Sequence, residues 1–279
     1  MHLNGLKDEF PTWIDAAGRP HAPATPDARI VSLVPSLTEL VFDLGLGDRL
    51  VGRTGFCVHP REALRAVPKV GGTKDVNLAR IRELAPTHVL VNVDENRLDT
   101  VEALAGFVPS IVVTHPCSPR DNLGLFELLG GLFAVPEAAR RLAAELEAAL
   151  AEAARLRAER SPENVLYLIW REPWMTVARD TYIAATLAEV GWQTLPAIEG
   201  GDTGAARYPA FGWNAPWLDG VARVLLSTEP YRFRAAHLSE VEALGRRPAL
   251  LVDGEMVSWY GSRAARGLRW LIELRRSLG

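Results

Sequence analysis

Short apolar runs alternate with amphipathic stretches along most of this chain, a pattern typical of strands followed by helices. In the first half, the runs that predict buried strands lie at 29–34, 50–52, 88–93 and 110–114, and the helical stretches lie around 37–44, 78–84 and 100–105. Strands that alternate with helices form parallel sheets covered on both faces. The first half therefore predicts one α/β lobe. The SLTE run at 36–39 has capping-box spacing, so we expect Ser36 and Glu39 to cap the first helix.

Residues 136–160 break this alternation, because they are almost all Ala, Leu, Glu and Arg. Pro136 suits a first helical turn, and Leu142, Leu146 and Leu150 fall on one stripe. A continuous helix here would be about 37 Å long, which is too long for an ordinary crossover between strands. We therefore predict one long backbone helix that joins two lobes.

The alternation resumes in the second half of the chain. Predicted strands lie at 165–169, 221–227 and 249–252, and predicted helices at 181–190, 239–244 and 268–274. Near the start, the turn signal at 15–19 predicts a small hairpin. The fold class is therefore α/β, with two Rossmann-like lobes and parallel sheets. The expected division is a leading segment with a hairpin at 1–28, an N-terminal lobe at 29–135, the linking helix at 136–160 and a C-terminal lobe at 161–279.

Composition narrows the function classes. Hydrophobic residues make up 48% of the 279 residues, and the net charge of -3 excludes a basic surface for nucleic acid. No apolar run is long enough to span a membrane, and two cysteines make no disulfide framework. The first eleven residues contain no apolar signal core, so we expect a cytoplasmic protein as numbered, or a periplasmic one if a leader was removed.

The common enzyme signatures are missing from the sequence. It has no nucleotide fingerprint of three spaced glycines, no zinc-protease helix and no nucleophile elbow. The GGTK run at 71–74 resembles a phosphate loop only superficially, because its Gly, Lys and Thr stand in the wrong order. We therefore expect a protein that is not an enzyme and has no intrinsic cofactor.

The side chains that stand out lie in the loops after the predicted strands, where open α/β sheets bind ligands. Five of the eight tryptophans lie in such segments of the second half: Trp170, Trp174, Trp213, Trp217 and Trp259. Wide aromatic faces suit a large, flat, partly apolar ligand, although a loop tryptophan can equally pack a domain together. The candidate ligand-binding residues are Pro35, Ser36, Phe56, Cys57, His59, Thr73, Lys74, Glu95, Asn96, Trp170, Arg171, Trp174, Arg207, Tyr208, Tyr231, Trp259 and Tyr260.

Two mirrored pairs raise the question of a metal site. Cys57 with His59, and His115 with Cys117, would supply four zinc-type ligands. A buried cysteine is more often a small hydrophobic residue, so we predict no metal site and leave open whether these four residues bind metal. A single histidine that faces the ligand, His59, is the favoured interpretation.

The RIVSLVPSLTE run at 29–39 closely resembles the opening of the cobalamin-, haem- and siderophore-binding proteins of ABC importers. These are periplasmic binding proteins with a helical backbone between two lobes. Further matches are VGGTK at 70–74, NL at 77–78 and LAPTHVL at 84–90. The chain is most similar to the cobalamin-binding branch, which combines a Cys-x-His-Pro segment with Gly-Gly-Thr-Lys.

This resemblance implies a class III periplasmic-binding-protein fold and a non-catalytic protein. The implied ligand is a corrinoid or a related metal chelate, such as haem or a ferric siderophore, captured between two lobes with small hinge motion. The implied partner is an ABC permease, which family members engage through one acidic residue on each lobe. Here Ala79 stands at the first of these positions, and 211–223 offers only Asp219, so we expect weak docking.

Two alternatives stay open at this stage. The first is a cytoplasmic carrier or sensor that uses the same fold for another small ligand and does not dock on an importer. The second is an enzyme built on this scaffold, with Cys57, His59 or Asp94 as acid, base or nucleophile.

Overall fold

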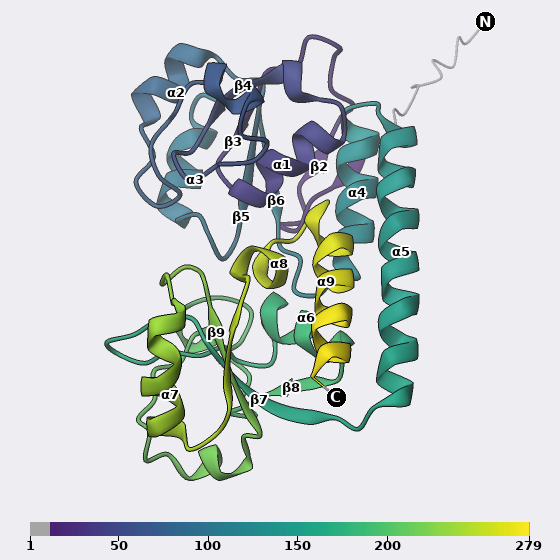
Figure 1. Cartoon of the computed structure of the whole chain (residues 1–279). Coiled ribbons are helices and arrows are strands. Elements are labelled where there is room, and N and C mark those ends of the chain that lie inside the picture. The colour runs from purple at the N-terminus through teal and green to yellow at the C-terminus, as the bar shows by residue number, and fades with distance from the viewer. Residues whose placement is uncertain (1–11, 279) are drawn as a thin grey trace, which may run out of the picture. The chain divides into compact units, whose positions relative to one another are not determined.

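The computed structural model describes residues 12–278, which pack as two compact units (Figure 1). The first unit comprises the described residues up to His115 and residues 124–141, and the second comprises residues 116–123 and the described residues from Leu142 onward. Each unit contains one four-stranded sheet with parallel pairing throughout. The predicted fold class is confirmed. The first eleven residues, on which the expected cytoplasmic location rests, lie outside the described part.

The first unit holds a sheet of order β4-β3-β5-β6 and a separate antiparallel hairpin, β1-β2. Its strands are β1 (Trp13–Ile14), β2 (Pro20–His21), β3 (Ile30–Ser32), β4 (Leu50–Arg53), β5 (His88–Asn92) and β6 (Ser110–Thr114). Its helices include α1 (Pro35–Asp43), α2 (Leu78–Leu84) and α3 (Leu98–Ala105), with short 3₁₀ turns at Gly47–Arg49 and Ala63–Ala66. Valines on β3 and β5, namely Val31, Val89 and Val91, fill the core beneath α2 and α3. The apolar runs in the sequence thus predicted each of the four sheet strands.

The predicted capping box at the start of α1 is wrong. The N-cap residue is Val34, and the helix begins at Pro35, one residue before Ser36. Proline lacks an N–H and has a fixed φ, so it suits the first helical position and moves the start of the helix forward. Thr38 uses its hydroxyl locally instead, donating to the Val34 carbonyl oxygen at 3.0 Å and to Ser32 Oγ at 2.9 Å.

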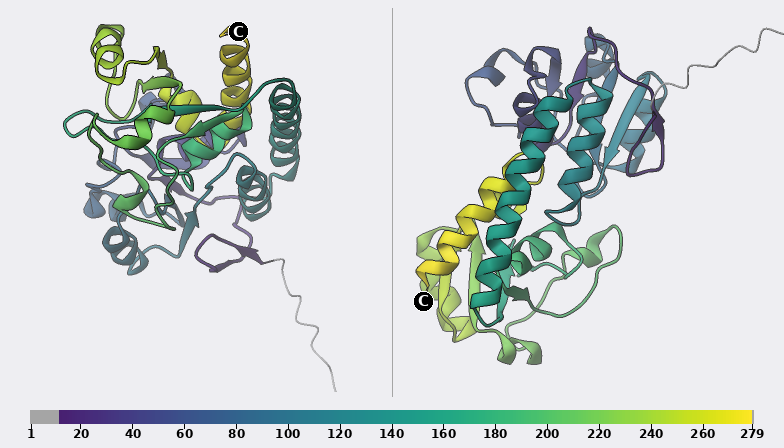
Figure 2. Two further views of the ribbon diagram at one scale, coloured as in Figure 1. Left: turned by 90° about the horizontal axis from the view of Figure 1, so that it is seen from below. Right: turned by 90° about the vertical axis from the view of Figure 1, so that its right-hand side faces the viewer.

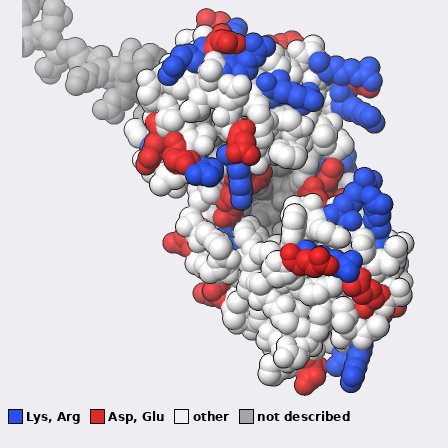
Figure 3. All heavy atoms as spheres, turned by 90° about the vertical axis from the view of Figure 1, so that its left-hand side faces the viewer, with Lys and Arg blue, Asp and Glu red and all other residues white. Residues whose placement is uncertain are grey.

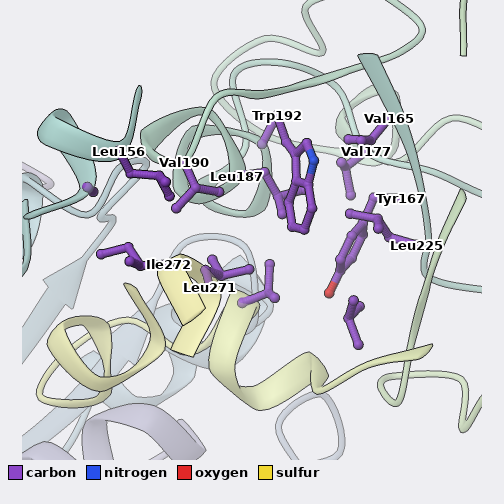
Figure 4. Close-up of a cluster of buried hydrophobic side chains, with 14 of the residues drawn as sticks. Leu156, Val165, Tyr167, Val177, Leu187, Val190, Trp192, Leu225, Leu271 and Ile272 are labelled. Atoms are coloured by element: carbon purple, nitrogen blue, oxygen red, sulfur yellow. The ribbon is translucent and has the colours of Figure 1, made fainter. Parts of the chain in front are cut away.

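The second unit holds a parallel sheet of order β10-β9-β7-β8. Its strands are β7 (Glu163–Leu168), β8 (Trp192–Thr194), β9 (Arg223–Ser227) and β10 (Ala249–Val252). Its helices are α6 (Tyr182–Glu189), α7 (Leu238–Gly245), α8 (Gly254–Ser258) and α9 (Arg263–Ser277), with 3₁₀ turns at Ala205–Arg207, Pro216–Gly220 and Ala235–His237. Figure 4 shows the core of this unit, where Trp192 and Tyr167 lie among leucines and valines contributed by α6, α9 and the sheet.

Two further helices, α4 (Asp121–Leu132) and α5 (Pro136–Glu159), contribute residues to both units. Helix α5 matches the long helix predicted at 136–160. In the second unit α9 lies alongside it (Figure 2), where Arg269 donates to the Glu145 carbonyl oxygen at 3.1 Å and Arg276 pairs with Glu152 at 2.9 Å. None of the helices in residues 12–278 combines the length and the apolar character that crossing a membrane requires.

Sequence patterns missed α4, β8 and α8. Helix α4 contains three glycines, which weaken the helical signal. One of them, Gly131, is required by packing, because a Cβ there would collide with the Trp13 ring. Strand β8 has three residues and α8 has five, too few for a periodic pattern to emerge.

Charge is well mixed on the face drawn in Figure 3. Lys and Arg side chains lie among Asp and Glu side chains, with broad uncharged areas around them. This face offers no continuous basic surface of the kind that would bind a polyanion, in agreement with the net charge of -3.

Candidate functional site

The candidate residues of the first unit gather at one edge of its sheet. Strands β3, β4, β5 and β6 run parallel, so the loops that follow them leave from the same, carboxyl edge. These loops carry Pro35 and Ser36 after β3, Phe56, Cys57 and His59 after β4, and Glu95 and Asn96 after β5. These seven candidates, chosen from the sequence alone, therefore lie at the edge where such sheets bind ligands.

Asn96 ties three of these segments together. Its buried side-chain amide nitrogen donates to the Leu33 carbonyl oxygen at 3.3 Å and to the Thr73 carbonyl oxygen at 3.0 Å. Its side-chain oxygen accepts from the Asn92 N–H at 2.9 Å. Because these bonds use its donors and its acceptor within the protein, Asn96 positions the loops. The bond from Asn96 to Thr73 also explains why Thr73 and Lys74, which follow no sheet strand, lie at the same edge.

The loop after β4 is held by Arg53, a residue that the sequence analysis missed. Its buried guanidinium donates to the carbonyl oxygens of Thr54 at 3.2 Å, Cys57 at 3.1 Å and Leu64 at 3.0 Å. No sequence pattern marks such a role, since the acceptors are backbone groups brought together only by folding. Arg53 fixes the path of the segment that presents Phe56 and His59.

Cys57 points inward from this loop. Its Sγ is buried and lies 3.0 Å from Thr38 Oγ1 and 3.1 Å from Thr54 Oγ1. Burial raises the pKa of the Cys57 thiol, although the two hydroxyls and Arg53 act in the opposite direction. A thiol rather than a thiolate is a poor nucleophile and a poor metal ligand, so the geometry gives Cys57 a packing role.

Phe56 lies beside Cys57 but points outward. Its side chain is 64% exposed, and its ring lies against Gly72, where a Cβ would come within 3.2 Å of it. His59 and Thr73 are half-buried, and Lys74 is exposed. The first unit thus presents an open aromatic face next to the Gly71–Lys74 loop.

The histidine and cysteine pairs show no metal centre. His115 lies 3.6 Å from Asp94 through its Nε2, and neither Cys57 nor Cys117 forms a disulfide. Within residues 12–278 there is no group of three or more His, Cys, Asp or Glu side chains placed to hold a metal ion.

In the second unit, Trp170 follows β7 at the carboxyl edge and is 40% exposed. Its ring stands edge-on to Tyr231, with 5.7 Å between ring centroids, and Tyr231 in turn packs on Phe233 at 4.6 Å. Next to it, Arg171 pairs with Glu240 at 2.8 Å. The structure therefore brings together Trp170, Arg171 and Tyr231, which come from the loops after β7 and β9.

Other loop tryptophans of this unit serve its packing. Trp174 stacks on Phe233 at 6.2 Å and meets Trp213 edge-on at 5.4 Å, while Trp217 contacts Phe211 at 5.4 Å. All these rings pack against the core built on β7 and β9. For Trp213 and Trp217 the packing interpretation holds, whereas Trp170 keeps a more exposed face.

Trp259 and Tyr260 are buried after α8. The Trp259 indole N–H donates to Glu229 Oε1 at 2.8 Å, the Arg263 guanidinium lies 4.5 Å from its ring centroid, and the Tyr260 ring meets Tyr182. Burial raises the pKa of the Glu229 carboxyl, against the bonds from Ser258 and Trp259. Both aromatic rings are thus engaged inside the unit, and a ligand contact by them stays a prediction.

Arg207 is almost fully buried and anchors a loop rather than facing solvent. It donates to the Gly201 carbonyl oxygen at 2.7 Å. Asp180 accepts from the N–H groups of Gly200 at 3.0 Å and Gly201 at 2.7 Å; burial alone would raise its pKa, but these bonds lower it. Tyr208 is half-buried against the unit's core, so ligand contacts by Arg207 and Tyr208 remain predictions.

The comparison with protein families decides the identity of the fold. Residues 30–209 match the family described as periplasmic binding protein. The chain belongs to this family. The match includes the RIVSLVPSLTE and VGGTK runs except Arg29, and it confirms the resemblance seen in the sequence.

Relatives and solved structures of this family are similar to the chain along different lengths. The vitamin B12-binding protein of Photorhabdus laumondii is 28% identical over 60% of this chain and 60% of its own length. The periplasmic vitamin B12-binding protein BtuF of Vibrio cholerae superposes with a TM-score of 0.75, at 18% identity, over 89% of this chain and 96% of that one. The periplasmic haem-binding protein RhuT of Roseiflexus sp. RS-1 gives 0.73, at 22% identity, over 90% and 98%. The sequence alignment thus spans less than two thirds of the Photorhabdus protein, and the two structures establish the shared fold.

Proposed function

We propose that this chain is a non-catalytic binding protein for a corrinoid or a related planar metal chelate. The observation that carries the proposal is the exposure of two aromatic rings at the carboxyl edges of the sheets, Phe56 at 64% and Trp170 at 40%. Large aromatic faces are usually buried, and those left open in strand-end loops suit a flat, partly apolar ligand. Relatives named for binding vitamin B12 or haem support this ligand class.

A corrinoid is our first choice within this class. The CVHP segment at 57–60 and the GGTK run at 71–74 favour the cobalamin-like branch, and several curated relatives are vitamin B12-binding proteins. His59 is half-buried in the same loop as Phe56 and is the side chain that we propose faces the bound chelate.

The absence of catalysis is part of the proposal. The three residues considered for an enzymatic role lie at the carboxyl edge of the first unit, but two of them are engaged otherwise. The Cys57 thiol is buried with a raised pKa, and Asp94 pairs with His115. Neither arrangement offers an activated nucleophile next to a general base.

One observation favours a second candidate function, a carrier or sensor that does not dock on a permease. Ala79 is exposed on the first turn of α2, where the resemblance implies a docking carboxylate. Its helical neighbour Arg80 pairs with Glu83 at 2.7 Å, so this glutamate is occupied locally. We propose that the chain binds its ligand without the paired carboxylate contacts of importer receptors. The expected cytoplasmic location stays a prediction, which cell fractionation tests.

The ligand class is tested by incubating the purified protein separately with cyanocobalamin, haemin and a ferric siderophore, then desalting each mixture. We expect the corrinoid absorption bands to travel with the protein. Retention of none of the three chelates would contradict the proposed function, and turnover of any of them would support the enzyme alternative.

A further inference from the structure

The N-terminus of α1 lies directly after β3, at the carboxyl edge of the first unit's sheet (Figure 1). Its N-cap residue is Val34, and among the described residues no side chain caps it. The N–H groups of Ser36 and Leu37 therefore lack acceptors within the helix, since the first i to i−4 bond runs from Thr38 to Val34. The helix dipole adds partial positive charge at this end.

Ser36 provides a second, independent observation at the same place. It is only 3% exposed, and within the described chain its Oγ has no hydrogen-bond partner. The neighbouring hydroxyls have their own acceptors. Ser32 donates to the Val34 carbonyl oxygen, and Thr38 donates to Ser32 Oγ and to the Val34 carbonyl oxygen. The Cα–Cβ bonds of a helix tilt toward its N-terminus, so the side chain of Ser36 leans toward the end where the N–H groups of Ser36 and Leu37 lie. A buried hydroxyl without a partner costs stability, which an incoming acceptor would restore.

The surroundings of this helix end are fixed. Asn96 binds both the Leu33 carbonyl oxygen, two residues before α1, and the Thr73 carbonyl oxygen, next to the exposed Lys74. On the neighbouring loop Asp94 is paired with His115, and Glu95 is half-buried. The donors of α1 thus sit in a held segment with an ammonium group on the adjoining loop.

Resting on the proposed function, we propose that the N-terminus of α1 binds an anionic oxygen substituent of the ligand. The donors are the Ser36 hydroxyl and the N–H groups of Ser36 and Leu37, a set that suits a carboxylate or a phosphate. The proposal restricts the expected ligands to planar metal chelates that carry an acidic side chain. Haem supplies carboxylates and cobalamin supplies a phosphodiester, so the shared chemistry is an oxyanion.

Two matched ligand pairs separate these sources. Haemin is compared with its dimethyl ester, which lacks free carboxylates, and cyanocobalamin with dicyanocobinamide, which lacks the phosphodiester. Each is titrated into the full chain and into Ser36→Ala, with tryptophan fluorescence as the readout. The matched control is Ser262→Ala, which removes another buried hydroxyl that has no partner in the described chain, before α9 in the second unit. Thermal melting verifies that both variants fold.

One of the two ligand pairs is expected to bind the parent. For that pair, we expect Ser36→Ala to lower the affinity for the acidic ligand by about tenfold, as for one lost hydrogen bond to a charged group, and to leave the affinity for the neutral ligand unchanged. Ser262→Ala should change neither. Equal binding of the acidic and neutral members by the parent, or an equal loss for both in Ser36→Ala, would overturn this subsite while leaving the proposed function intact. If no chelate of either pair binds the parent, the proposed function fails, and the subsite fails with it.

Discussion

The side-chain nitrogen of Asn96 lies 3.0 Å from the carbonyl oxygen of Thr73 and joins the loop after β5 to the Gly71–Lys74 loop. The same nitrogen reaches the Leu33 carbonyl oxygen. One amide therefore sets the spacing of three segments at the carboxyl edge of the first sheet.

Replacing Asn96 with Ala should remove these bonds and leave buried backbone groups without partners. We expect the free energy of unfolding to fall by about 2 kcal/mol, as measured by urea denaturation. Asn214→Ala, at an exposed position, is the control and should cost under about 0.5 kcal/mol. Equal stability of the two variants would show that the hydrogen bonds of Asn96 do not stabilise the fold.

Arg53→Lys should loosen the loop after β4, because an ammonium group cannot reproduce the forked contacts with three carbonyl oxygens. Cys57 is buried by this loop, so its labelling by a thiol reagent should accelerate at least tenfold. The measurement is made in a Cys117→Ser background, so that Cys57 alone reacts. An unchanged labelling rate in Arg53→Lys would mean that Arg53 does not hold the loop.

The buried side chain of His88 should lower the stability of the fold in mild acid. Burial, aided by the charge of His21, lowers its pKa to about 4, against an ordinary value of 6.5. Between pH 6.5 and about pH 4, His88 is therefore protonated in the unfolded chain and neutral in the folded chain. The free energy of unfolding falls as the pH drops through this range. The contribution from pH 7 to pH 5 is about 2 kcal/mol.

This expectation is checked by urea denaturation at the two pH values in the parent and in His88→Gln. The variant should show a smaller difference by roughly that amount. An NMR titration that places the pKa of His88 near 6.5 would contradict the argument directly.

Ala79→Glu should create the carboxylate that the resemblance implies for docking on the first unit. The side chain would be exposed on the first turn of α2, where a negative charge also suits the helix dipole. We expect the parent to bind a cognate permease weakly in a pull-down, and Ala79→Glu to bind it several-fold better, with Ala79→Gln as the uncharged control. Tight binding by the parent would show that the chain docks without this charge.

The sequence was most informative where structure depends on local pattern. The valine-rich runs at β5 and β6 located these strands to within a residue, because parallel strands buried on both faces read as continuous apolar segments. The same logic located the carboxyl-edge loops and so the neighbourhood of Phe56 and Trp170.

The roles of single side chains could not be predicted in this way. Arg53 looks like any polar residue at a strand end, and its acceptors exist only once the chain has folded. Trp170 and Trp213 are both loop tryptophans, yet one is open and the other packs on Trp174 and Phe211. The capping box failed because Pro35 competed with Ser36 for the start of the helix.

The central claim is that open aromatic faces at the carboxyl edges bind a planar chelate. Isothermal titration with cyanocobalamin tests it, in the parent, Phe56→Ala, Trp170→Ala and the control Ile14→Ala, which removes an exposed apolar side chain from the hairpin. We expect measurable binding by the parent and Ile14→Ala, and a Kd about tenfold weaker in each aromatic variant, since a buried ring contributes about 1 to 3 kcal/mol. Unchanged affinity in both Phe56→Ala and Trp170→Ala would contradict the account.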